Sequence, residues 1–287
     1  MTVTTFTNSD AYALIDIPEA PIVIGPVRQA KKVLQRTTQD LARHATYALA
    51  AFGVSGAGGA AALNLDPSAA DDDSVQAFSG ELSRWADRVG FSATGALGID
   101  PDALRGLLRT GSTAAPALAA TARGAAGELS GARVIVTTDA IDESLSNELE
   151  EASAGSIDCT SDLASAFAAG ADVVFVRGST GCVSHSTVDG IRAGRLVGLQ
   201  PLTFTARGLA VATRAGVEVV PDFISAAGPV LAATGDKWPP ERLRTVAAET
   251  TAAAGEHADM FVAAAEAAEA NMRKWSERLP FGRPLAP

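Results

Sequence analysis

The chain has 287 residues, which fits one large domain or two ordinary ones, and its 47% hydrophobic and 20% charged residues argue against a disordered protein. A net charge of −10 disfavours nucleic acid and anionic membranes as partners, because an acidic surface repels both. The two cysteines, Cys159 and Cys182, lie far apart without CxxC spacing and predict neither a metal site nor a disulfide framework. Together with an N-terminal segment that lacks a signal-peptide pattern, they favour the reducing cytoplasm.

One segment raises the question of a membrane span. Residues 45–65 carry no charge and are long enough to cross a bilayer. They consist mostly of alanine and glycine, which insert with little gain in free energy, and the glycines at 56–59 weaken a helix. We therefore expect no transmembrane helix here.

The first third of the chain predicts strands and two helices. The β-branched stretch LIDIPEAPIVI, 14–24, indicates one or two strands, and 29–50 has the apolar spacing of a helix. We expect a glycine-rich loop next, containing GAGG, 56–59. Such loops usually bring the backbone close to a ligand, because glycine has no Cβ to block the approach. The strand AALNL, 61–65, and an amphipathic helix over 74–90 complete this part.

From about residue 112 the pattern changes to helices that alternate with buried strands, which is typical of a parallel α/β sheet. We expect strands in GARVIVTT, ADVVFVRG and GVEVV, and a short helix followed by a strand over 186–199. The last 40 or so residues predict two helices broken near Gly255. The predicted fold is α/β: a substrate and dimerisation-type domain at 1–111, a reduced Rossmann-like domain at 112–240, and C-terminal helices at 241–287 that pack back on the first domain.

Four stretches resemble the Glu/Leu/Phe/Val amino-acid dehydrogenase family. LARHATYALAAFGVSGAGGAAALNLDP is similar to the family's LARxMTYKxAxAGLxxGGGKxxIxxDP, and AGVEVVPDFISAAGPV to its GIxxxPDFxxNAGGV. RTGSTAAPAL lies near the family's TG…TAxG segment, and ADVVFVRGSTGCVSHSTVDGIRAGRLVGL near its ADIxxPCAxGGxIxxxTxxxLxxxxVxxG. The resemblance implies a substrate domain, a Rossmann domain and a cleft between them, in a homodimer or larger homo-oligomer. In that family NAD(P) takes a hydride from an L-amino acid, and the imine is hydrolysed to a 2-oxo acid and ammonia.

This chain departs from the family where the resemblance implies catalysis. Alanine replaces the lysine that holds the substrate carboxylate, at Ala48, and the lysine that serves as base, at Ala60. The family's catalytic aspartate aligns with Ala96, and the asparagine of NAGG with Ala226. Alanine can neither bind a carboxylate nor move a proton, so we expect the old chemistry to be absent.

The cofactor side departs too. The family's GxGNVG loop lets a pyrophosphate reach a helix N-terminus, but here the strand runs into TTDAIDES, with Asp139, Asp142 and Glu143 in place of glycines. Carboxylates there repel a pyrophosphate. The interval before ADVVFV is also shorter than a full βαβαβ half requires. We expect no cofactor, with NAD(P) implied by resemblance only; Thr113 and Asp158 are the remaining contacts for it, and a turn or capping role is favoured for Asp158.

The residues left to form a ligand cleft are small, apolar or singly polar. Arg177 follows a strand at the carboxyl edge of the sheet, where open α/β sheets bind ligands; a solvent-exposed loop arginine is favoured there, with an anion site as the alternative. His44 is interpreted as a surface or half-buried helix residue, and His185 as part of a stretch explained by helix capping from Ser184 or Ser186. The cleft candidates are Tyr47, Gly56, Gly58, Gly59, Arg177, Ser179, His185 and Ser225.

Three functions remain open from the sequence. The favoured one is a protein that keeps the dehydrogenase fold but not its chemistry, and that binds a small apolar or amino-acid-like ligand or assembles with an active relative. The second is an enzyme with new chemistry in the same cleft. The third is an NAD(P)-dependent oxidoreductase that acts on an amino acid or imine through an altered loop.

Overall fold

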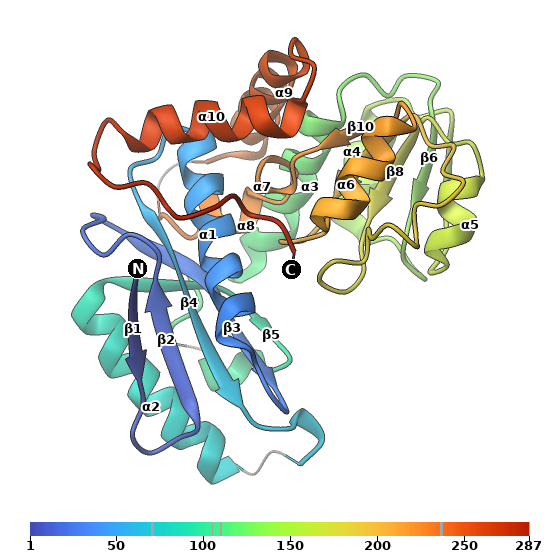
Figure 1. Cartoon of the computed structure of the whole chain (residues 1–287). Coiled ribbons are helices and arrows are strands. Elements are labelled where there is room, and N and C mark those ends of the chain that lie inside the picture. Colours follow the sequence, from blue (N-terminus) through green and yellow to red (C-terminus); the bar gives the residue numbers. More distant parts are fainter. Residues whose placement is uncertain (70–71, 105, 110, 236–237, 287) are drawn as a thin grey trace. The chain divides into compact units, whose positions relative to one another are not determined.

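The computed structural model describes residues 1–69, 72–104, 106–109, 111–235 and 238–286 (Figure 1). The chain divides into two compact units. The first unit comprises Met1–Ala114, Pro229–Lys237 and Ala268–Pro284, and the second comprises Ala115–Gly228, Trp238–Ala267 and Leu285–Pro287.

The first unit is built on a five-stranded mixed sheet in the order β1-β2-β4-β3-β5. Strands β1, β2 and β4 pair antiparallel, whereas β3 pairs parallel with both β4 and β5. Helices α1 and α2 cover opposite faces: α1 lies against Gly58 of β4, and Trp85 of α2 contacts Phe91, which lies on the face of Gly59. The elements are β1 (Thr2–Thr5), β2 (Ala11–Ile15), β3 (Val23–Ala30), α1 (Gln35–Ala51), β4 (Ala57–Asn64), α2 (Asp72–Val89) and β5 (Phe91–Leu97).

The predicted glycine loop is wrong for Gly58 and Gly59, because both belong to the central strand, and only Gly56 precedes it. Gly58 and Gly59 lie in β4, where Gly58 pairs with Ile24 and Gly59 with Ile15. A Cβ on Gly58 would collide with the backbone carbonyl of Ala42 in α1, and one on Gly59 would lie 2.6 Å from Cγ1 of Val23. Gly58 therefore serves close packing of α1 on the sheet and Gly59 close packing on the opposite face, rather than approach to a ligand.

The structure moves one predicted boundary in the first unit and confirms the other predicted elements there. The strand β3 continues to Ala30, so the helix predicted over 29–50 begins only at Gln35. The stretch 14–24 contains the end of β2 and the start of β3, which confirms strands there. The amphipathic helix predicted over 74–90 is α2.

A buried carboxylate on α2 holds the turn between β1 and β2. Glu81 accepts hydrogen bonds from the backbone N–H of Thr7 at 2.8 Å and of Asn8 at 3.1 Å, and from the hydroxyls of Thr7 at 3.0 Å and Ser9 at 2.8 Å. Burial of Glu81 alone would raise its pKa, but these hydrogen bonds hold the pKa below its usual value. The turn is therefore fixed to the helix by a single side chain.

We expect Glu81→Ala to lower the free energy of unfolding by about 2–3 kcal/mol, because it leaves several donors of the turn without an acceptor. Urea denaturation followed by circular dichroism measures this. Glu81→Gln, which keeps one acceptor oxygen, is the matched control and should cost less. Equal stability of the alanine variant and the parent chain would show that the turn does not depend on Glu81.

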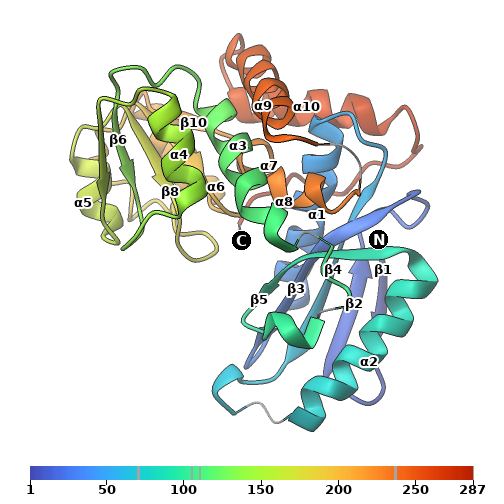
Figure 2. The same cartoon turned by 180° about the vertical axis from the view of Figure 1, so that it is seen from behind.

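The second unit contains a fully parallel sheet in the order β10-β9-β8-β6-β7. Helix α6 lies over the face of this sheet seen in Figure 1, and α4 over the opposite face seen in Figure 2. This confirms the predicted alternation of helices and parallel strands. The elements are α3 (Ala114–Ala126), β6 (Arg133–Val136), α4 (Glu143–Glu151), β7 (Ser156–Cys159), α5 (Leu163–Ala168), β8 (Val173–Val176), β9 (Arg195–Gly198), α6 (Ala206–Arg214), β10 (Glu218–Val220), α7 (Asp222–Ser225) and α9 (Pro240–Gly255).

The strand order makes the sheet shorter than a classical dinucleotide-binding sheet. Numbered from β6, the order is 2-1-3-4-5, in which β7 lies on one side of β6 and β8 on the other. A Rossmann half would place two strands where only β7 lies between β6 and β8 in the chain. This confirms the expectation drawn from the short interval. The strand that follows β6 in the chain, β7, lies on one side of it, and the next strand, β8, lies on the other. Open α/β sheets bind ligands at such a switch in strand order.

The C-terminal helices divide between the units. α9 ends at Gly255 and α10 spans Met260–Met272, which confirms two helices with a break at the predicted place. The end of α10 packs on α1, where Asn271 donates to the carbonyl of Ala50 at 2.9 Å. α9 belongs to the second unit, where Arg244 pairs with Glu148 of α4 at 2.8 Å. Only the last part of the chain therefore packs back on the first unit. The short helix that precedes α9 in the chain, α8, spans Gly228–Ala232.

Within the described ranges, no helix is both long and apolar enough to cross a membrane. The same residues contain no group of three or more His, Cys, Asp or Glu side chains placed to hold a metal ion.

Candidate functional site

The carboxyl ends of β6 and β8 form the switch point of the second sheet. The hydroxyl of Thr137, directly after β6, donates to the carbonyl of Arg177 at 2.8 Å and accepts from the N–H of Arg177 at 2.7 Å. Next along, the N–H of Gly178 donates to the side chain of Gln200 at 3.0 Å, and Gln200 donates to the carbonyl of Ser179 at 2.9 Å. The loops at this edge are thus joined by the chain's own polar groups.

A carboxylate occupies the helix end at this switch point. Asp142 is the N-cap of α4 and accepts from the N–H of Leu145 at 3.0 Å. Its other carboxylate oxygen lies 3.4 Å from the guanidinium of Arg177. In a dinucleotide-binding loop, the N–H groups of this helix end and a nearby cation would face a pyrophosphate. Here Asp142 uses both of them.

Arg177, for which an anion site is the alternative to an exposed loop arginine, therefore pairs with a carboxylate of the chain itself. Its side chain remains 41% exposed, so the pair with Asp142 is partly solvated and the guanidinium keeps donors that face solvent. Ser179 lies in the same loop and is exposed. Arg177 and Ser179 both lie in the segment that follows β8.

The ends of β9 and β10 meet at a buried carboxyl group. Asp222 begins α7 directly after β10, is 1% exposed, and accepts from the N–H of Thr203 at 2.7 Å. Burial raises its pKa to about 7. Ser225, three residues on, is also buried and donates to the carbonyl of Gly198 at 2.7 Å. Ser225 therefore supports the end of β9. Asp222 is a titrating group, and the only sequence signal for it is the PDF motif.

Both histidine interpretations are corrected. His44 is buried in α1 at 1% exposure, rather than at or near the surface. His185 is exposed in a turn, and no helix follows it over 186–199. The hydroxyl of Thr187 accepts from the N–H of Ser184 at 2.8 Å and donates to the carbonyl of Cys182 at 2.8 Å, so Thr187 rather than a serine holds this turn.

The family's catalytic positions lie in the first unit. Ala48 in α1 and Ala60 in β4 are both buried, and Ala60 lies on the face of β4 that α1 covers. Ala96 lies in β5, half-buried, beside Val27. Methyl groups at these positions provide packing and no proton transfer.

Tyr47, next to Ala48, has a polar partner on α10. Its hydroxyl donates to Glu269 at 2.9 Å, and Glu269 also accepts from Arg283 at 3.3 Å. Burial, followed by the neighbouring carboxylate, raises the pKa of Tyr47 above its usual value, so the phenol stays protonated. This contact joins α1 to the end of α10 within the first unit.

The two remaining cofactor candidates lie in different units. Asp158 is the next-to-last residue of β7 and pairs with Arg133 at 3.5 Å, so the favoured turn or capping role is wrong. Thr113 ends a short 3-10 helix in the first unit, and residue 110 of the same stretch lies outside the described residues. Of the predicted cleft residues, the first unit holds Tyr47, Gly56, Gly58 and Gly59, and the second holds Arg177, Ser179, His185 and Ser225.

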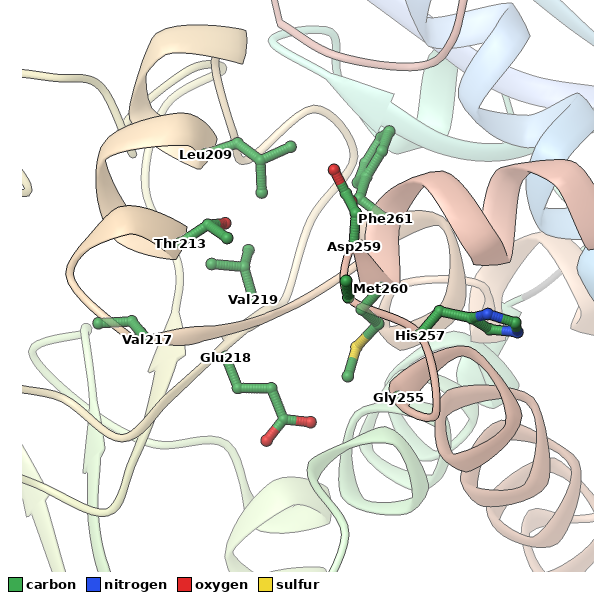
Figure 3. Close-up of a pocket in the computed structure, with 11 residues that line it drawn as sticks. Leu209, Thr213, Val217, Glu218, Val219, Gly255, His257, Asp259, Met260 and Phe261 are labelled. Carbon is green, nitrogen blue, oxygen red and sulfur yellow. The ribbon is translucent and has the colours of Figure 1, made fainter.

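A small cavity of about 140 Å³ lies elsewhere in the second unit, beside the edge strand β10 (Figure 3). Leu209, Thr213 and Val219 face it from α6 and β10, and Met260 and Phe261 from the start of α10. The residues that line it include no lysine or arginine, and His257 points away from the apolar side chains. This cavity is apart from the switch point.

Comparison with known proteins shows the fold. No protein-family model matches the chain, and no characterised protein matches it by sequence. Among solved structures, L-tryptophan dehydrogenase from Nostoc punctiforme has a TM-score of 0.73 at 14% identity over 96% of both chains. The leucine-bound hetero-hexameric glutamate dehydrogenase from Thermus thermophilus has a TM-score of 0.72 at 17% identity, over 92% of this chain and 83% of that one. Plasmodium falciparum glutamate dehydrogenase follows with 0.68 at 12% identity, over 92% and 77%. The chain therefore has the fold of the amino-acid dehydrogenases, as the resemblance implied.

Proposed function

We propose that this chain is an amino-acid-dehydrogenase-like protein without dehydrogenase chemistry, which binds a small molecule or assembles with other chains. The observation that carries this proposal is Asp142 at the switch point of the second sheet, where it caps α4 and pairs with Arg177. A dinucleotide pyrophosphate would have to bring two negative charges to a helix end that a carboxylate already occupies.

The family's catalytic positions support the same proposal. A lysine with a lowered pKa can hold a substrate carboxylate or remove a proton, and losing one such group typically costs 10²–10⁴-fold in rate. Here the aligned positions are Ala48, Ala60 and Ala96, of which the first two are buried. The chain has four lysines, and none of them lies between residues 33 and 236. Neither the base nor the carboxylate anchor has a lysine to replace it nearby in sequence.

Assembly is the second part of the proposal. The relative from Thermus thermophilus is a hetero-hexamer, so this fold is found in complexes of unlike chains. A chain that keeps the scaffold while its catalytic positions are methyl groups would suit a non-catalytic subunit, in a homodimer, a larger homo-oligomer or beside an active relative. Light scattering of the purified protein, alone and mixed with such a relative, measures which complex forms.

Cofactor binding tests the proposal directly. We expect calorimetric titration with NAD(H), NADP(H) and ADP-ribose at millimolar concentration to give no binding heat, and thermal unfolding to be unchanged. A ligand at a hundred times its Kd would stabilise the protein by about 2.7 kcal/mol, which is easily detected. ADP-ribose separates the pyrophosphate site from the nicotinamide site. Saturable binding of any of the three would contradict the proposal and favour an oxidoreductase with an altered loop.

A further inference from the structure

The cavity of about 140 Å³ shown in Figure 3, here called the edge cavity, lies wholly in the second unit. β10 is the last strand of its sheet, so it pairs with β9 on one edge and has a free edge on the other. Residues of α6, of β10 and of the start of α10 line the cavity, and none of the described lining residues belongs to β9. The edge cavity therefore lies at the free edge of β10.

Val219, the middle residue of β10, points its main-chain N–H and C=O towards this free edge. The N–H of the preceding residue, Glu218, donates to the carbonyl of Gly194 at 3.0 Å, so the main-chain groups of Glu218 face β9. Because successive residues of a strand alternate in this respect, those of Val219 face away from β9. Val219 is 4% exposed and lines the edge cavity. Within the part of the chain that the structure describes, neither its N–H nor its C=O has a hydrogen-bond partner.

Two unpaired main-chain groups on a buried residue are unusual. More than about 90% of buried N–H and C=O groups in proteins are hydrogen-bonded, because burial takes each of them out of bulk water. A molecule that enters the edge cavity can therefore gain two hydrogen bonds at Val219. The N–H and C=O of one extended residue lie side by side, so such a molecule needs an acceptor and a donor side by side as well.

A primary carboxamide meets this requirement. Its C=O accepts a hydrogen bond, and one N–H bond of its amino group points in the same direction as the C=O. An open-chain secondary amide does not meet it, because its single N–H is trans to the C=O and the cis form is rarely populated. The main-chain groups of Val219 therefore distinguish between amides by their geometry.

The rest of the lining favours a small molecule with an apolar group. Leu209, Met260 and Phe261 contribute apolar side chains, which Figure 3 places at the cavity. A cavity of about 150 Å³ lined by apolar side chains holds benzene, so the edge cavity, which is of similar size, has room for about six non-hydrogen atoms.

The charged groups of the lining favour an uncharged ligand. Glu218 pairs with Arg195 at 2.6 Å, and Asp259 accepts from the N–H of Val262 at 3.0 Å at the start of α10. Asp259 is also exposed to solvent, so it attracts a cation only weakly. His257 points away from the apolar side chains, and the described residues of the lining include no lysine or arginine. An anion would therefore be placed without a cation beside it, which disfavours a carboxylate.

We propose that the edge cavity binds a small primary carboxamide, whose C=O accepts from the N–H of Val219 and whose N–H donates to the C=O of Val219. The apolar group of the ligand lies against Leu209 and Phe261. The proposal does not rest on the loss of dehydrogenase chemistry, because neither Asp142 nor the aligned alanine positions line the edge cavity.

The test uses small probes of similar size that differ in hydrogen bonding. The full chain is isotope-labelled at valine nitrogen, and the N–H signal of Val219 is identified by nuclear magnetic resonance as the one missing from Val219→Ile. Isobutyramide and the cyclic amide 2-pyrrolidone, whose ring holds the N–H cis to the C=O, are expected to shift this signal until it saturates. The trans amide N-methylpropanamide and methyl isopropyl ketone each offer only one of the two hydrogen bonds, and are expected to bind about tenfold more weakly. Isobutyrate and isobutylamine, which are charged, are also expected to bind more weakly than isobutyramide.

Two matched variants locate the site. Thr213→Leu adds an apolar side chain to the edge cavity from an exposed position on α6, so the protein is expected to fold and to bind isobutyramide about tenfold more weakly. Thr245→Leu makes the same change at an exposed position of α9 outside the lining, and should bind as the parent chain does.

A Val219 signal that isobutyramide leaves in place would overturn the proposal. Equal affinity of isobutyramide and methyl isopropyl ketone would also overturn it, because the donor of the ligand would then have no role. The same holds for isobutylamine binding more tightly than isobutyramide, and for a Thr213→Leu protein that binds isobutyramide as the parent chain does. Cofactor titration has no bearing on these outcomes, so the proposal and the proposed function fail separately.

Discussion

Gly58→Ala is expected to destabilise the protein by about 3 kcal/mol or more, which is a large part of the stability of an ordinary domain. The added Cβ would collide with the backbone carbonyl of Ala42 and lie 2.9 Å from the backbone nitrogen of Thr46. Backbone cannot rotate away as a side chain can, so α1 must move off β4. That movement also breaks the 2.8 Å hydrogen bond from the N–H of Gly58 to Thr46. Denaturant unfolding, or the yield of folded protein if unfolding cannot be measured, shows the effect.

Gly80→Ala provides the matched control. Gly80 lies inside α2, where an added Cβ would meet only the end of Arg84 at 3.6 Å, an ordinary contact. Alanine favours a helix over glycine by about 1 kcal/mol, so this variant should be more stable than the parent chain. Two identical substitutions then have effects of opposite sign. A folded Gly58→Ala protein of normal stability would show that α1 and β4 are not packed as described.

Asp222→Asn is expected to remove a strong pH dependence of stability. The pKa of Asp222 is raised by burial from 3.8 to about 7, so the folded state holds a proton that the unfolded state releases. The stability that Asp222 contributes is therefore complete below about pH 4 and is lost as the pH rises to about 7, by about 1.4 kcal/mol per pH unit. Asparagine cannot ionise and can still accept the hydrogen bond from the N–H of Thr203.

Denaturant unfolding at several pH values between 4 and 8 measures this for both proteins. The Asn variant should match the parent chain in acid and exceed it above pH 7. Asp142→Asn serves as the comparison, because Asp142 is a partly exposed N-cap and its removal should leave the pH dependence in place. A parent chain whose stability rises between pH 5 and 7 would contradict a neutral buried Asp222.

Strong local patterns in the sequence predicted most of the fold. The spacing of apolar residues in α2, from Phe78 to Trp85, marks a helix whatever it packs against. The continuous apolar runs of β6 and β8 mark strands buried on both faces of a parallel sheet. Each of these patterns is set within a single element, so neighbours far away in the chain are not needed to interpret it.

The predictions that were wrong depended on neighbours that sequence spacing does not reveal. GAGG reads as a loop because glycine usually marks one, but Gly58 is needed for the contact with Ala42 of α1, and Gly25 for its contact with Gly59 of the adjacent strand. The helix expected near residue 190 failed because the polar side chain of Thr187 satisfies the backbone of a turn.

The residues of the candidate sites differ in the same way: local sequence patterns locate some of them, and others depend on contacts between distant segments. Asp142 could be located from the sequence because it lies between a buried strand and the helix that it precedes, which is the place of a phosphate loop or a cap. The main-chain groups of Val219 face a cavity only because β10 is the last strand of its sheet and the start of α10 lies nearby, so no local pattern signals them. The raised pKa of Asp222 likewise depends on burial by the rest of the second unit.

Amino-acid oxidation by the purified protein tests the central claim most directly. The protein is incubated with NAD⁺ or NADP⁺ and with each protein amino acid in turn, and formation of reduced nicotinamide is followed by absorbance beside an active dehydrogenase. We predict no reduction above the enzyme-free rate with any amino acid. Turnover that requires both the cofactor and one amino acid, and that scales with protein concentration, would contradict the account.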